Sequence, residues 1–198
     1  MKKYKLTSET KVIDGVEVHR IKALNSFWDI KKGELGGWIE SEKNLSQDGN
    51  AWVYGDAKVS GNARIFDNAI IGGNAIIFGN ATVSGNAWVF GDATVCGDAK
   101  GCGDAKVRGN ATVSGNATVD GNATVSGNAD YIVFKNWWSS GRYFTWTRSN
   151  NKWSVGCFYG SGEELIAKAY KDSEKSGREY ERVVKYVESI LKEENNNK

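Results

Sequence analysis

Histidine and cysteine are the side chains that proteins use most often for acid–base, nucleophilic and metal chemistry, and this chain has few of them. His19 is the one histidine among 198 residues, and the three cysteines are Cys96, Cys102 and Cys157. The cysteines form no Cys-x-x-Cys pair, and their odd number argues against a disulfide scaffold. The sequence therefore predicts no catalytic residue, no metal site and no cofactor.

Aromatic and basic side chains are more abundant, and they gather in two places. Two basic residues lie close together near the middle of the chain, and residues 137–153 are rich in tryptophan and arginine. Aromatic rings stack on nucleotide bases, and guanidinium groups bind phosphate with paired hydrogen bonds. We therefore predict a small, anionic, nucleotide-like ligand. The predicted ligand-binding residues are Lys106, Arg108, Trp137, Arg142, Trp146 and Arg148.

A six-residue repeat must position many of these side chains. From Gly49 to Ala129 the chain repeats Gly-Asn/Asp-Ala-x-Val/Ile-x, with Asp67 interrupting the glycine column and Gly101 the Val/Ile column. Residues two apart in a strand face the same side, so the Ala and Val/Ile columns point inward. Gly-Asn and Gly-Asp favour turns. Each hexad is therefore predicted to be one short strand followed by one corner.

This pattern resembles the hexapeptide-repeat family, whose repeat is an aliphatic residue, any three, a small residue and any one. The segment Val59-Ser60-Gly61-Asn62-Ala63-Arg64 fits it. The resemblance implies a mainly β fold, a left-handed parallel β-helix with three hexads per coil, so that residues i and i+18 stack. The expected corner ladders are Asn62, Asn80, Asp98 and Asn116, and Asn68, Asn86, Asp104 and Asn122.

The segments that flank the repeat are predicted to be caps. Residues 1–48 are expected to form an N-terminal β cap, residues 49–130 the β-helix, and residues 131–198 a C-terminal α+β unit, a β-hairpin plus two helices. Asp14-Gly15 is a hairpin turn signal. The stretches Gly-Gly-Trp-Ile-Glu and Asn-Leu-Ser-Gln resemble those of hexapeptide-repeat proteins of bacteria and their phages. Capping an open solenoid end prevents end-to-end association.

One outer face of the predicted β-helix carries a cluster of large apolar side chains. An exposed aromatic cluster of this size usually marks an interface. A neighbouring protomer, the N-terminal segment or the C-terminal unit could cover it. Proteins of the resembled family commonly form trimers side by side, so a homotrimer is the first prediction and cover within the chain the alternative. The predicted oligomer interface is Trp52, Tyr54, Ile70, Trp88 and Phe90.

These features favour a non-catalytic oligomeric binding protein. The phage resemblance suggests a counter-defence protein that sequesters a nucleotide-derived signal. The alternatives are an inhibitor that binds a protein, a structural or virion accessory part, and an acyltransferase. Acyltransferases of the resembled family use a histidine as base, a role that only His19 could fill. They also carry a long loop that leaves one coil, and the repeat here runs without one.

Charge and hydropathy limit the classes of partner that the sequence predicts. The net charge is +2, which gives no whole-chain signature for long nucleic acid or for an acidic membrane surface. No apolar run reaches the length of a membrane span, and no apolar segment follows the basic start of the chain. The expected location is cytoplasmic, in the host cell if a phage encodes the chain.

Overall fold

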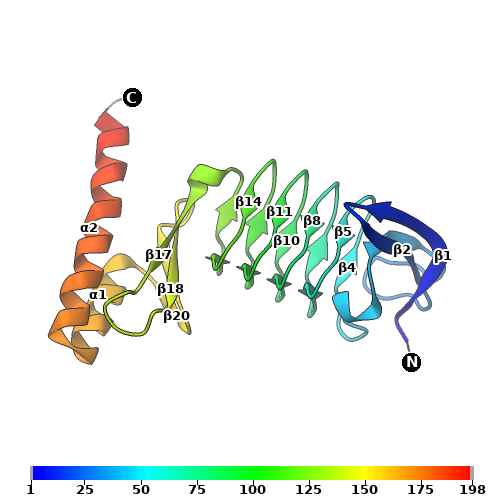
Figure 1. Ribbon diagram of the computed structural model, residues 1–198, viewed down its shortest axis with the longest axis horizontal. Helices are drawn as coiled ribbons and strands as arrows, with labels where there is room; N and C mark the ends of the chain where they lie inside the picture. The colour runs from blue at the N-terminus through cyan, green and yellow to red at the C-terminus, as the bar shows by residue number, and fades with distance from the viewer. Residues whose placement is uncertain (1, 197–198) are drawn as a thin grey trace.

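The computed structural model describes residues 2–196 and shows a rod (Figure 1). A β cap stands at the N-terminal end, a stack of parallel coils follows, and a sheet with two helices stands at the C-terminal end. The cap contains β1 (Tyr4–Ile13), β2 (Val16–Ala23), β3 (Leu35–Ile39) and a short 3-10 helix, η1 (Glu42–Asn44). Strand β3 pairs in parallel with a strand of the coils, so the stack begins inside the segment predicted as the cap.

The coils consist of two-residue strands. They are β4 (Trp52–Val53), β5 (Lys58–Val59), β6 (Arg64–Ile65), β7 (Ile70–Ile71), β8 (Ile76–Ile77), β9 (Thr82–Val83), β10 (Trp88–Val89), β11 (Thr94–Val95), β12 (Lys100–Gly101), β13 (Lys106–Val107), β14 (Thr112–Val113), β15 (Thr118–Val119) and β16 (Thr124–Val125). They stack into three parallel sheets. Trp88 pairs with Ile70 on one side and with Lys106 on the other, so the predicted eighteen residues per coil are confirmed.

The interior of the coils is filled by the two columns predicted to point inward. The alanines from Ala51 to Ala123 and the aliphatic residues from Val53 to Val125 are all buried. Ala129 departs from this pattern and is exposed, because η2 (Asn128–Asp130) turns the chain out of the stack. The expectation that Ala129 faces inward was therefore wrong, although the repeat motif reaches it.

Gly101 interrupts the aliphatic column without disturbing the register. Strand β12 keeps its pairing with both neighbours, and a Cβ at Gly101 would meet only Val83 Cγ1, at 3.8 Å. Because its φ lies outside the left-handed region, Gly101→Ala is expected to raise the free energy of unfolding by about 0.4–1 kcal/mol in urea denaturation. Gly103→Ala is the matched control and should lower it by roughly 1–2 kcal/mol, since Gly103 has φ +65°. A destabilised Gly101→Ala protein would contradict this reading.

The corner ladders form as predicted over most of their length. Each amide donates to the side chain eighteen residues later, as in Asn62 to Asn80 at 3.2 Å and Asn80 to Asp98 at 2.9 Å. The second ladder runs through Asn50, Asn68, Asn86 and Asp104. Within residues 2–196 no hydrogen bond extends the ladders to Asn116 or Asn122. A carboxylate has no N–H to pass on, so each ladder ends at its aspartate.

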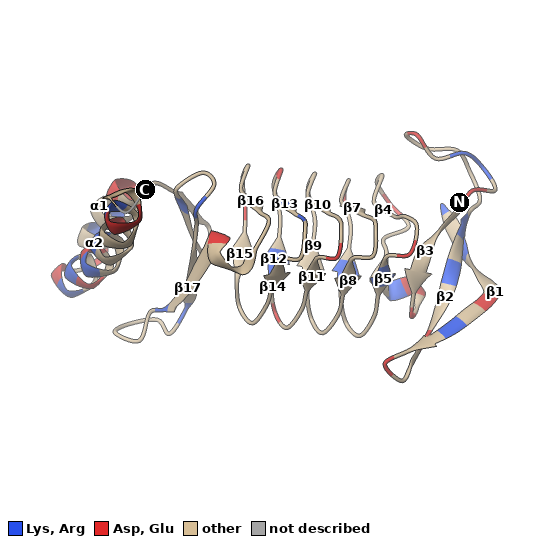
Figure 2. Cartoon of the chain, turned by 90° about the horizontal axis from the view of Figure 1, so that it is seen from above, with Lys and Arg blue, Asp and Glu red and all other residues tan. Residues whose placement is uncertain are grey.

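The C-terminal unit is an antiparallel sheet covered by two helices. The sheet contains β17 (Tyr131–Lys135), β18 (Tyr143–Thr147), β19 (Lys152–Val155) and β20 (Phe158–Gly160), and the helices are α1 (Gly162–Asp172) and α2 (Glu174–Asn196). Figure 2 shows charged residues concentrated on these helices and sparse on the coils. Neither helix is apolar over a length that would cross a membrane, among the residues that the structure describes. The predicted mainly β fold with this sheet and two helices is confirmed.

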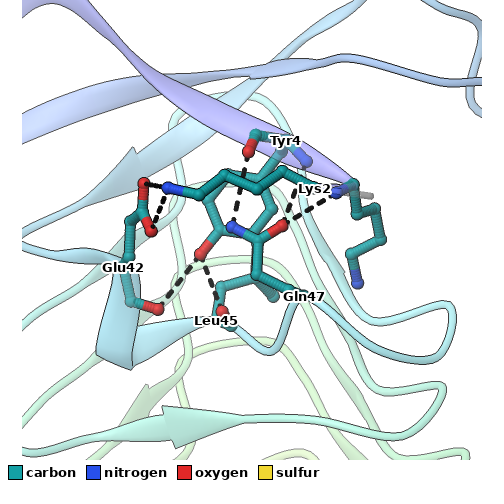
Figure 3. A network of polar contacts seen from close by, with 6 residues as sticks. Lys2, Tyr4, Glu42, Leu45 and Gln47 are labelled. Atoms are coloured by element: carbon teal, nitrogen blue, oxygen red, sulfur yellow. Dashed lines mark hydrogen bonds and ion pairs between the residues drawn. The ribbon is translucent and has the colours of Figure 1, made fainter.

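The N-terminal end of the stack presents carbonyl oxygens, and the cap supplies donors to them. The Tyr4 hydroxyl lies 2.7 Å from the carbonyl oxygen of Leu45 and 3.1 Å from that of Glu42, within the polar network of Figure 3. Lys3 Nζ donates to the Ala51 carbonyl at 2.9 Å and to two preceding carbonyls. Burial lowers the pKa of Lys3 to about 8.

Asn44 supplies the other donors at this end. It is fully buried, and its amide nitrogen donates to the carbonyl oxygens of Gly61 and Ala63 at 3.0 and 2.9 Å. Its amide oxygen accepts from the backbone N–H of Ser41 at 2.9 Å. Asn44 stands eighteen residues before Asn62, so it occupies the first position of an exposed ladder but turns inward.

Backbone groups at the C-terminal end are capped as well. Within the coils the outward-facing residue of each strand donates its N–H to the next coil, as Trp88 N does to the Ala105 carbonyl. The last coil has no successor, so side-chain oxygens of the following segments accept instead. The N–H of Thr118 donates to Thr145 Oγ1 at 2.9 Å, and that of Thr124 donates to Ser149 Oγ at 2.7 Å. The segment after the coils also donates, since the Tyr131 hydroxyl lies 2.8 Å from the Thr112 carbonyl oxygen. The C-terminal end therefore has both its N–H and its carbonyl groups capped.

Candidate functional site

The most prominent exposed aromatic feature of the coils lies on the sheet that contains β10 and β13. Trp88 is 44% exposed, and its ring centroid lies 5.9 Å from that of Phe90. The Phe90 ring lies over Gly72, where a Cβ would come within 2.4 Å of it, so this position leaves room for the ring only as glycine. Trp88 of β10 and Phe90, which directly follows this strand, therefore form an aromatic pair at the surface.

Two cations lie beside these rings. Lys106 pairs with Trp88 across the sheet, and its Nζ lies 5.8 Å from the ring centroid. Arg108 is exposed, and its Nε donates to Ser126 at 3.2 Å. Neither cation forms an ion pair in the described part of the chain. Together with Trp88 and Phe90 they line a hollow of about 260 Å³.

A second hollow, of about 310 Å³, adjoins the first at Trp88. It is also lined by Trp28, which is 60% exposed, and by the ladder of Asn50, Asn68 and Asn86. Each amide of this ladder uses one N–H along the axis and has a second one available. We call the two hollows together the aromatic–cationic groove, bounded by Trp28, Trp88, Phe90, Lys106 and Arg108.

Comparison with known proteins places the coils in a recognised class of repeats. A family model described as the YdcK beta solenoid repeat matches residues 57–73 and 75–91. The chain is a hexapeptide-repeat-like β-helix protein. The "Uncharacterized acetyltransferase YdcK" of Escherichia coli (strain K12) is 37% identical over 62 residues. That match covers 27% of this chain and 19% of the relative, so the chain matches less than a fifth of the relative's length.

The β-helix protein does not bring all predicted ligand-binding residues together. Lys106 and Arg108 lie in the groove, whereas Arg142 lines a separate cleft in the C-terminal unit. Trp137 lies on the loop before β18 and is 73% exposed. The sequence thus combined residues that belong to two different surfaces.

Two other predicted ligand-binding residues serve the chain itself. Trp146 is 1% exposed, and its Nε1 donates to Asn151 Oδ1 at 2.8 Å. Arg148 binds the Glu194 carboxylate through both terminal nitrogens, a contact that raises the pKa of the arginine. This corrects the roles predicted for Trp146 and Arg148, because burial occupies the first and an internal ion pair the second.

The cap covers part of the predicted oligomer interface. Trp52 is fully buried against Phe27, with ring centroids 5.4 Å apart, and Ile70 is 4% exposed. The Tyr54 hydroxyl donates to Asp29 at 2.9 Å. Cover within the chain, the alternative left open by the sequence, thus removes Trp52 and Ile70 from the surface. Trp88 keeps its exposure.

The histidine lies in the N-terminal cap. His19 lies on β2 and pairs through its backbone with Thr10 and Ile39. No group of three or more His, Cys, Asp or Glu side chains is placed to hold a metal ion within residues 2–196. Sequence reasoning missed Trp28, whose signal was weak because it lies in an irregular segment between β2 and β3.

Proposed function

We propose that this chain is a non-catalytic binding protein whose aromatic–cationic groove holds a small nucleotide-like anion. The observation that carries the proposal is the exposed ring of Trp88 beside two cations that form no ion pair within residues 2–196. A base stacked on an aromatic side chain gains about 1–3 kcal/mol. Lys106 and Arg108 supply the charge that a phosphate requires.

The second hollow suits the rest of such a ligand. Trp28 and Trp88 line this hollow together with the asparagine ladder, so a planar group within it can contact rings and amides together. Amide N–H groups and carbonyl oxygens match the edges of bases. Sequestration of a nucleotide-derived signal, as in a counter-defence protein, is the role that we propose for this binding.

Titration calorimetry with adenosine monophosphate and adenosine tests the proposal. Trp88→Ala is expected to weaken binding of the nucleotide roughly five- to 150-fold, the equivalent of one lost stacking contact. Adenosine should bind more weakly than the monophosphate because it carries no charge for Lys106 and Arg108. Trp137→Ala is the matched control, since Trp137 is exposed but lies outside the groove. Equal affinity in the Trp88→Ala and Trp137→Ala proteins would refute the proposal.

The oligomeric state is a linked proposal. A homotrimer would cover Trp88 and Phe90, the members of the predicted interface nearest the groove. Native mass spectrometry of the 21.7 kDa chain with and without adenosine monophosphate reports subunit number and bound mass together. If the protein is a trimer that does not bind the nucleotide, the groove is an interface between subunits. Capture of one specific protein would favour the inhibitor alternative.

An acetyltransferase is the second candidate function, and the printed name of the YdcK relative favours it. His19 would be the base in such an enzyme, since it is the one histidine of the chain. This candidate predicts that acetyl-coenzyme A binds the protein and that acetyl transfer is lost in His19→Ala. Absence of acetyl-coenzyme A binding in the same calorimeter would remove it.

A further inference from the structure

A cleft of about 450 Å³ lies in the C-terminal unit, away from the aromatic–cationic groove. It is bordered by the loop between β17 and β18, the ends of β19 and β20, α1 and the first turns of α2. Val155, Phe158 and Leu165 line it with apolar surface. Its size falls within the usual range for small-molecule sites, which combine apolar walls with a few polar groups.

Tyr180 contributes a polar group that is not fully satisfied. It is 7% exposed, and its hydroxyl accepts from Asn136 Nδ2 at 3.0 Å. The hydroxyl proton has no acceptor among the described residues. Burial raises the pKa of Tyr180, so this group is a neutral donor near neutral pH. A buried donor that lines a cleft favours a ligand with an acceptor oxygen.

Two cations line the same cleft. Arg142 and Lys168 form no ion pair within residues 2–196, whereas Asp172 is the single acidic residue of the lining. Three basic residues on the outer surface of α2 differ. Arg178, Arg182 and Lys185 are each paired with a glutamate of their own helix. The cleft therefore carries a net positive charge that is not neutralised locally.

We propose that this cleft binds a small organic oxyanion that carries an apolar group. The oxyanion, a carboxylate or a phosphate monoester, would take the Tyr180 O–H and the guanidinium of Arg142, while the apolar group lies on Phe158 and Leu165. Arg142 is suited to this because its fork of N–H groups matches two oxygens. The site is independent of the groove, so either can fail without the other.

Amide chemical shifts of the full chain, titrated with benzoate, phenyl phosphate and benzamide, test the proposal. Benzoate or phenyl phosphate should shift the amides of Ser140, Arg142 and Ser176 saturably, and the stronger of the two identifies the anion. Benzamide has the same shape without charge and is expected to bind roughly tenfold or more weakly. Binding of benzamide as tight as that of both anions would overturn the proposal, and so would no saturable shift at the cleft.

Substitutions locate the contact. Arg142→Gln is expected to weaken binding of the preferred anion roughly tenfold or more. Arg182→Gln is the matched control, because Arg182 lies on the same helix as Tyr180 but pairs with Glu179 outside the cleft. Tyr180→Phe keeps the ring that packs on Trp138 and Phe144. This variant should bind the preferred anion more weakly, while its amide spectrum remains that of a folded protein. Unchanged affinity in Arg142→Gln would overturn the proposal.

Discussion

Replacing Asn44 by aspartate is expected to lower the free energy of unfolding by roughly 3–5 kcal/mol. The side chain is fully buried, and its amide nitrogen holds the carbonyl oxygens of Gly61 and Ala63. A carboxylate of the same shape would face these oxygens with negative charge and no donor. Urea denaturation followed by circular dichroism measures the loss.

The pH dependence of this variant provides a second readout. Burial beside two carbonyl oxygens should raise the pKa of the introduced carboxyl in the folded protein above its value in the unfolded chain. The folded state then binds the proton more tightly, so the variant should regain stability as pH falls through the folded-state pKa. Asn62→Asp is the control, since Asn62 stands exposed one coil later and other positions of its column are aspartate. An equal loss in both variants would contradict the carbonyl-binding role of Asn44.

Thr145→Val is expected to destabilise the protein by about 1–3 kcal/mol. Valine matches threonine in shape but has no oxygen to accept the N–H of Thr118, which would be left without its partner at the C-terminal end. Thr145 is 1% exposed, so little water can replace the lost acceptor. Denaturation in urea is again the measurement.

Thr118→Val is the matched control for this prediction. It changes the outward side chain of β15 to the same residue type but keeps the backbone N–H that donates to Thr145. Its free energy of unfolding should stay within about 0.5 kcal/mol of the parent. If the two variants lose the same stability, the hydroxyl of Thr145 does not cap the stack.

The interior of the coils could be predicted because its determinants are local. Alanine and a branched aliphatic residue two positions apart recur with each hexad. Once the inward-facing positions of one Gly-Asn-Ala-x-Val-x hexad are known, the same positions face inward in the other hexads. The stacking of Trp88 between Ile70 and Lys106 follows once there are three hexads per coil, a number that the resemblance to hexapeptide-repeat proteins implied. Only the last hexad deviates, where η2 carries Ala129 out of the stack.

The candidate site was less predictable because its exposure depends on distant segments. Trp52 and Trp88 hold equivalent positions in the repeat, yet Phe27 and Tyr4 of the cap bury the first and leave the second exposed. The sequence around Arg148 suggested a ligand-binding residue, but in the structure α2 places Glu194 beside it and the two form an ion pair. Contacts between residues so far apart in the chain cannot be read from the six-residue pattern.

Because each coil repeats the backbone pattern of the coil before it, the length of the rod can change in whole coils. Every internal coil is hydrogen-bonded to the coil before it and to the coil after it, so a duplicated coil inserted between them could form the same hydrogen bonds with both neighbours. Gene duplication could therefore move the cap and the helical unit apart in steps of about 4.8 Å, the spacing of adjacent strands. The separation between the N-terminal cap and the C-terminal unit would then evolve as a whole number of coils, without any change to the residues that cap the two ends.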